Sequence, residues 1–152
     1  MFEFQVSHAR DPERYLAKES LSLSLSPWQE GGMQVERLKY VIWAADMDRA
    51  LNFYVRVFGA EVIKRSDVIS EVAVGGGVIG IHGGGEGQRT WTGLTFQVAD
   101  VLTGAREVVA AGGSLSREPE PEDGEPPHLA MCADPEGNEF MLTRRRVRPA
   151  VA

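Results

Sequence analysis

Side chains that could act as catalysts are few in this chain, which contains three histidines and one cysteine. His128 and Cys132 fall on one face of a predicted strand, but four residues along a strand span roughly 13 Å. That distance is too long for the hydrogen bond of a thiolate–imidazole nucleophile. His82 precedes three glycines at the end of another predicted strand, which is more typical of a solvated strand end than of a catalytic base. We therefore predict no catalytic residue.

The chemistry that the sequence favours instead is the binding of an organic molecule. Along the stretches 39–46, 93–100 and 139–143, alternate residues point to a core, so the residues between them point to the opposite face. That face carries aromatic, thioether and a few polar side chains, as small-molecule pockets do. The predicted ligand-binding residues, with Trp91 included if its strand begins that early, are Lys39, Val41, Trp43, His82, Trp91, Thr95, Glu139 and Met141.

Three of these residues have alternative interpretations. Trp43 and Trp91 could hold a planar or cationic ligand by stacking, or they could be ordinary hydrophobic residues that a partner chain covers. Lysine is rarely buried without a partner, so Lys39 could reach the rim of the cleft, pair with Glu139 or bind an anion.

The elements that must position these residues form a pattern that occurs twice. In each copy an alternating stretch ends in an aspartate, Asp46 or Asp100, and helix-period residues follow it. Aspartate is a good helix N-cap, and a glycine, Gly59 or Gly112, ends each helical stretch. Three short strands follow each helix, predicted at 61–64, 70–74 and 78–82 in the first copy and at 114–117, 129–133 and 139–143 in the second.

The repeat predicts an α+β fold in which two βαβββ units form a cupped mixed β-sheet around a cleft, with the helices on the outer face. Gly75-Gly-Gly-Val-Ile-Gly80 matches the dinucleotide-binding pattern, but a strand follows it where that pattern needs a helix, so we predict a hairpin turn. The acidic, proline-rich segment 117–127 is predicted to be an exposed loop, either a solvated connector or an acidic lid near the cleft.

A turn motif near the end of the chain connects this repeat to a known family. Asp134-Pro-Glu-Gly-Asn138, together with Asp46 and Ala50-x-x-Phe53-Tyr54, resembles the vicinal oxygen chelate superfamily over residues 34 to 145. That superfamily includes glyoxalase I, bleomycin resistance proteins and extradiol dioxygenases. The resemblance is specific for the fold and much less specific for function, because one fold supports many activities.

Enzymes of that superfamily hold a divalent metal ion with His, Glu or Gln at three or four strand positions. The resemblance places these positions at Lys39, Gly93, Met141 and at or beside Gly80 or His82. An ammonium, a missing side chain and a thioether are unsuited to magnesium, manganese, iron(II) or zinc. We therefore expect no metal and no other cofactor.

Composition limits the partners and the location of the protein. A net charge of −6 and a pI near 5.1 argue against nucleic-acid binding, although the tail Arg144-Arg-Arg-Val-Arg148 is basic. The sequence has no apolar run of roughly 20 residues and no secretory signal, so no membrane association is expected. A lone cysteine fits the reducing cytoplasm. Homodimerisation is expected by analogy with the superfamily.

The sequence predicts two segments, an N-terminal extension over 1–32 and a glyoxalase-like domain over 33–148, with repeats at about 34–86 and 91–145. The extension could form a small hairpin or be mobile. The leading hypothesis is a metal-independent protein that binds a small organic molecule. One alternative is a metal-dependent lyase, isomerase or dioxygenase of the glyoxalase type, with the metal on His82, Glu139 and residues of a partner chain. Another is a dimeric interaction module with no ligand.

Overall fold

The structure, a computed structural model, describes residues 33–146. The chain divides into two units, Met1–Glu36 and Arg37–Ala152, and both repeats lie in the second. The predicted extension over 1–32 lies outside the described residues, so both alternatives for it stay predictions.

The first repeat has the order of elements that the sequence predicts. It consists of β1 (Lys39–Ala44), α2 (Met47–Phe58), β2 (Glu61–Lys64), β3 (Ile69–Val74) and β4 (Gly77–Gly83). These strands form a four-stranded sheet in the order β1-β4-β3-β2. β1 pairs with β4 in parallel, and the other two pairs are antiparallel.

The second repeat has the same topology. It consists of β5 (Thr90–Gln97), α3 (Val101–Ala110), β6 (Ser114–Leu115), β7 (Leu129–Ala133) and β8 (Asn138–Thr143). The sheet order is β5-β8-β7-β6, again with a parallel first pair. β6 is only two residues long, because the proline-rich acidic segment that follows it leaves the sheet.

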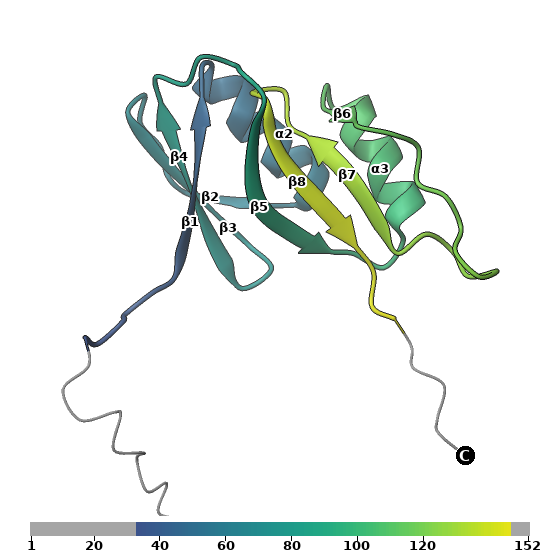
Figure 1. The fold of residues 1–152 in the computed structure, drawn as a ribbon. Coiled ribbons are helices and arrows are strands. Elements are labelled where there is room, and N and C mark those ends of the chain that lie inside the picture. Colours follow the sequence, from purple (N-terminus) through teal and green to yellow (C-terminus); the bar gives the residue numbers. More distant parts are fainter. Residues whose placement is uncertain (1–32, 147–152) are drawn as a thin grey trace, which may run out of the picture. The chain divides into compact units, whose positions relative to one another are not determined.

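Both helices lie on the same side of the strands, so each sheet has one covered face and one bare face (Figure 1). β1 and β5 are edge strands, and they are neighbours where the two repeats meet (Figure 1). The sheets remain two separate four-stranded ladders rather than one continuous cup. The predicted pair of βαβββ repeats with outer helices is therefore confirmed, and the cupped sheet is built from two halves.

The helix boundaries follow from the predicted caps. The Asp46 side chain accepts a hydrogen bond from the Arg49 backbone N–H, and Gly59 ends α2 in the left-handed conformation at φ 61°. Asp100 caps α3 in the same way, by accepting from the backbone N–H groups of Leu102 and Thr103. α3 ends at Ala110, and its C-cap is Ala111, one residue before the predicted glycine.

One hydrophobic core joins the two repeats. The strand residues predicted to face the helices, among them Ile42, Phe140 and Leu142, are buried or pack against the core. Phe58 of α2 stacks on Phe96 of β5 with ring centroids 3.9 Å apart. Phe53 and Tyr54 of α2 also contact aromatic rings of the second repeat. The repeats therefore share side chains across their boundary, and the bare faces of both sheets have a common support.

Over residues 33–146, no helix is both long and apolar enough to cross a membrane.

The strand face, a candidate ligand site

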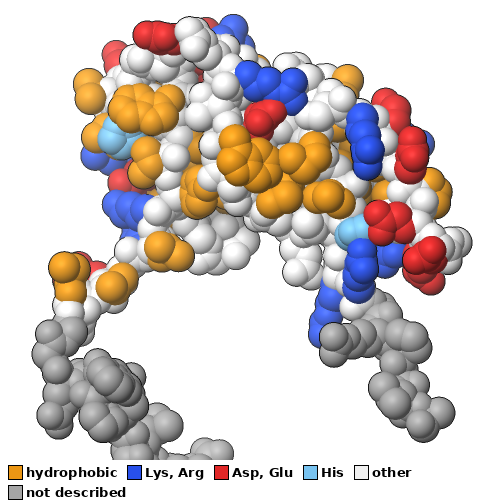
Figure 2. All heavy atoms as spheres, in the orientation of Figure 1, with side chains coloured by type: hydrophobic (Ala, Val, Ile, Leu, Met, Phe, Trp, Pro, Cys, Tyr) orange, Lys and Arg blue, Asp and Glu red, His pale blue; other side chains and the backbone are white. Residues whose placement is uncertain are grey.

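We call the surface of the two sheets that lies opposite the helices the strand face. The predicted ligand-binding residues of the first repeat lie on adjacent rows of this face, with Val41 beside Gly80 and Trp43 beside His82. In the second repeat, Thr95 lies beside Met141. Figure 2 shows hydrophobic side chains grouped across this face, with charged side chains among and around them.

Two tryptophans dominate the apolar part of the strand face. Trp43 and Trp91 each expose 53% of their surface, and Val41 is similarly exposed. The Trp43 ring is tilted against His82, with centroids 5.1 Å apart. His82 is half-buried by this contact rather than fully solvated at a strand end. Exposed aromatic side chains that group with other apolar side chains are typical of a surface that binds a ligand or a partner protein.

A bulge in β5 decides where Trp91 points. Two extra residues, Thr92 and Gly93, lie between the paired positions of Trp91 and Leu94. Because the insertion has two residues, the alternation is preserved, and Trp91 stays in register with Glu139 on the strand face. The Thr92 hydroxyl stabilises the bulge by donating to the Glu139 carbonyl oxygen at 2.6 Å.

The same bulge removes Gly93 from use as a metal-ligand position. Gly93 has φ of 71°, a conformation that residues with a side chain rarely adopt. A Cβ atom added there would lie 3.2 Å from the Tyr40 hydroxyl. The sequence showed only that a side chain is missing at this position, whereas the structure also gives a reason why glycine is needed.

Charged groups on the strand face are paired with one another. Lys39 Nζ lies 2.8 Å from Glu71 Oε1. The pairing with Glu139 that the sequence suggested is therefore wrong, because Glu139 forms an ion pair with Arg89 instead. The hydrogen bond from Lys39 lowers the pKa of the Glu71 carboxyl below its ordinary value. The sequence reasoning missed Glu71, since its pairing depends on which strands are neighbours.

These residues do not fit a divalent metal ion. The positions that the superfamily uses carry the Lys39 ammonium, the bulge glycine Gly93 and the Met141 thioether. In the part of the chain that the structure describes, no three His, Cys, Asp or Glu side chains are close enough to hold a metal ion. The two ligands of the metal-dependent alternative, His82 and Glu139, belong to different sheets.

A polar cluster that the sequence did not assign holds the two halves of the strand face together. The Glu136 side chain, completely buried, accepts hydrogen bonds from the backbone N–H groups of Ala45 and Asp46, at 2.7 and 3.0 Å. Arg49 donates to its other oxygen at 2.5 Å. This pairing raises the pKa of the Arg49 guanidinium. Glu136 of the second repeat thus binds the N-terminal end of α2 in the first.

Two further residues of the same turn cross between the repeats. Asp134 accepts a hydrogen bond from the Tyr54 hydroxyl at 2.9 Å, and burial raises the pKa of both groups. The Asn138 side chain bonds both the backbone N–H and the carbonyl of Trp43. We call this cluster the latch; its members are Arg49, Tyr54, Asp134, Glu136 and Asn138. The latch therefore joins the end of β1, which carries Trp43, to the turn that leads into β8, the strand paired with Trp91 of β5.

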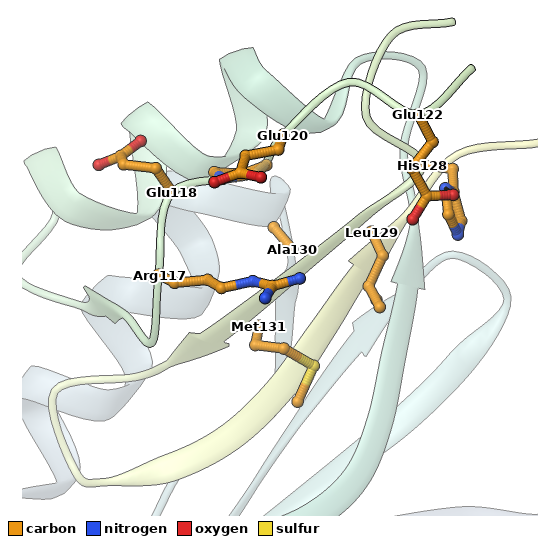
Figure 3. A pocket seen from close by; sticks show the side chains of 9 residues that line it. Arg117, Glu118, Glu120, Glu122, His128, Leu129, Ala130 and Met131 are labelled. Atoms are coloured by element: carbon orange, nitrogen blue, oxygen red, sulfur yellow. Dashed lines mark ion pairs between the residues drawn. The ribbon is translucent and has the colours of Figure 1, made fainter.

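The acidic segment 117–127 is an exposed loop, as predicted, apart from one short bridge between Glu122 and Glu125. The cavity between this loop and β7 has a volume of about 50 Å³, and Figure 3 shows the side chains that line it from both sides. Arg144 and Arg146 of the basic tail form ion pairs with Glu125 and Glu122. Organic ligands need pockets of about 300 Å³ or more. These contacts favour a connector tied down by the tail rather than an acidic lid.

Cys132 is buried, and burial raises the pKa of its thiol to about 11. A thiol with that pKa is a poor nucleophile at neutral pH.

The Glyoxalase/Bleomycin resistance protein/Dioxygenase superfamily matches residues 37–142. The chain belongs to this superfamily. A lactoylglutathione lyase of Arabidopsis thaliana is 29% identical in an alignment of 132 positions that covers 74% of this chain and 46% of that protein. The chain therefore spans about half the length of this curated relative.

Solved structures of the superfamily share the fold. The fosfomycin resistance protein FosX from Listeria monocytogenes superimposes with a TM-score of 0.63 at 20% identity, covering 77% of this chain and 96% of that one. A mutant of FosX was solved with Mn(II) and 1S,2S-dihydroxypropylphosphonic acid, and it superimposes with a TM-score of 0.59 at 22% identity over 72% of this chain and 90% of that one. At this level of identity the similarity establishes the fold alone.

Proposed function

We propose that this superfamily member binds a small organic molecule on its strand face without a metal ion. The observation that carries the proposal is the Lys39–Glu71 ion pair, which lies at the position where a metal-dependent member needs its first ligand. An ammonium there repels a divalent cation and occupies the carboxylate nearest to it. The proposed ligand-binding residues are those predicted from the sequence: Lys39, Val41, Trp43, His82, Trp91, Thr95, Glu139 and Met141.

The chemistry of the strand face indicates the kind of molecule. Trp43 and Trp91 offer exposed indole faces, which stack on planar rings and attract cations. The charged neighbours, Lys39 with Glu71 and Arg89 with Glu139, are already neutralised in pairs. A planar aromatic ligand, neutral or singly cationic, would therefore gain stacking without having to displace a strong ion pair.

A metal-dependent lyase of the glyoxalase type is the second candidate. It is favoured by the 29% identity with a lactoylglutathione lyase and by the manganese ion bound to FosX. It requires His82 and Glu139 to be joined by ligands from a partner chain. Its consequences are activity that a chelator abolishes and loss of bound metal in a His82→Ala variant.

Three further expectations belong to the proposal. The protein forms a homodimer, by analogy with the superfamily. It resides in the cytoplasm, and it binds neither nucleic acid nor membranes. None of these is needed for ligand binding by the strand face.

Fluorescence titration with 9-aminoacridine, a planar cation, tests the proposal. We expect saturable quenching of tryptophan emission and a higher melting temperature, both lost in a Trp43→Ala, Trp91→Ala double variant. A Val68→Ala variant should bind the dye with an affinity within about twofold, because Val68 is exposed and lies outside the proposed site. Quenching that appears only after Mn²⁺ is added would favour the metal-dependent candidate.

A further inference from the structure

Apolar packing joins the two repeats, as between Phe58 and Phe96, and the polar latch joins them at one end. At that end, the turn between β7 and β8 carries the latch residues Asp134, Glu136 and Asn138 across to the first repeat. The corresponding turn of the first repeat, between β3 and β4, pairs Val74 with Gly77. Its two central residues are glycines at φ of 56° and 79°, a two-residue hairpin turn without side chains. The two central residues of this turn therefore offer no polar side chain for a second latch.

The second helix also lacks counterparts of the latch residues that the first helix carries. The first helix carries Tyr54 eight residues after its N-cap, whereas the second helix carries Val108 at the same distance from Asp100. At the position of Arg49 the second helix has Thr103, which bonds its own N-cap instead. The pseudo-symmetry of the two repeats is therefore broken at the contacts that join them.

A groove of about 680 Å³ lies where the second latch is missing. It runs between the β3–β4 turn, the C-terminal half of β5 and the end of α2. The residues that line it are Leu38, Tyr40, Val57, Phe58, Val74, Gly75, Gly77, Val78, Ile79, Leu94, Thr95, Phe96, Gln97 and Val98. We call this the inter-repeat groove. Its volume is in the range of small-molecule sites.

The lining determines what the groove could hold. It contains no charged side chain, and its polar groups are those of Tyr40, Thr95 and Gln97. A charged ligand would lose its hydration there without gaining a counter-charge. The stacked rings of Phe58 and Phe96 offer aromatic surface to a ligand.

We propose that the inter-repeat groove binds an uncharged, largely apolar aromatic molecule, at a second site beside the strand face. Of the eight proposed strand-face residues, only Thr95 also lines the groove. At the latched end the space between the repeats is filled by the polar turn of the chain itself. At the opposite end, none of the described residues fills the inter-repeat groove. A small apolar molecule suits both the volume of the groove and its uncharged lining.

Titration with N-phenyl-1-naphthylamine, an uncharged fluorescent probe, tests the proposal on the full chain. We expect saturable binding with one probe per chain. Val57 lines the groove, so Val57→Trp should fill part of it and weaken binding by about tenfold or more. Val55 lies exposed on the same helix and does not line the groove, so Val55→Trp is the matched control and should leave the affinity within about twofold.

A second pair of variants keeps the test decisive if Val57→Trp does not fold. Leu38 is exposed at the groove, and Leu38→Glu brings a charge to an uncharged lining, so it should also weaken binding. Val68 is also exposed but does not line the groove, so Val68→Glu should leave binding unchanged. The proposal would be overturned by the absence of saturable binding, by unchanged binding in both Val57→Trp and Leu38→Glu, or by loss of binding in Trp43→Ala.

A change of oligomeric state in Leu38→Glu would also overturn it, because a second copy of the chain would then cover the groove.

Discussion

Lys39 is the residue that most separates this chain from a metal-dependent relative. Its ammonium donates to Glu71 and lowers the pKa of that carboxyl, so the stability that the pair contributes is present above the unfolded pKa of glutamate. It is lost as pH falls through the lowered folded pKa. We expect Lys39→Met to raise the pKa of Glu71, measured by NMR titration of its carboxyl carbon. Arg65→Met, which removes the exposed partner of Asp48, is the control and should leave Glu71 unchanged. An unchanged pKa in Lys39→Met would contradict the pairing.

Cys132 gives a second prediction at the same scale. Its thiol is buried and its pKa is raised to about 11, so the reactive thiolate is scarce at pH 8. A thiol reagent such as Ellman's reagent should leave the native protein unmodified at that pH and modify one thiol per chain in denaturant. Rapid modification of the native protein would show that β7 opens easily or that the thiol is exposed.

At the scale of elements, the β7–β8 turn and the start of α2 are joined by the latch. Glu136 is buried and accepts three hydrogen bonds, whereas Asp48, an exposed residue of α2, pairs with Arg65 at the surface. In Glu136→Gln, an uncharged amide replaces the carboxylate that accepts from Arg49 and from two backbone N–H groups. We expect this variant to lower the free energy of unfolding by about 2–4 kcal/mol. Asp48→Asn should cost less than about 1 kcal/mol. Urea unfolding measures both, and equal effects would contradict a structural role for the latch.

The elements also show how far the sequence alone could reach. Local periodicity predicts α2 with its caps and assigns the faces of β1, β5 and β8, because these features depend on neighbours in the chain. Pairing of Lys39 with Glu71 was not among the three alternatives, since Glu71 approaches Lys39 only because β4 pairs with both β1 and β3. The β5 bulge, the latch and the inter-repeat groove depend on contacts between the repeats, which no local pattern encodes.

At the scale of the whole molecule, the strand face and the dimer interface are expected to be different surfaces. The homodimer should have twice the chain mass of 16.6 kDa in light scattering. Trp43→Glu places a charge on the strand face and should abolish ligand binding while leaving that mass unchanged. A fall to the monomer mass would show that the exposed tryptophans are the dimer contact, and the interaction-module hypothesis would then be preferred.

The central claim is that the protein acts without a metal ion. Elemental mass spectrometry of protein purified without chelator or affinity tag tests this claim most directly. We predict near-zero zinc, manganese, nickel and iron, because Lys39, Gly93 and Met141 stand where ligands are needed. About one divalent ion per chain, retained after dialysis, would contradict the account and would make the glyoxalase-type enzyme the leading function.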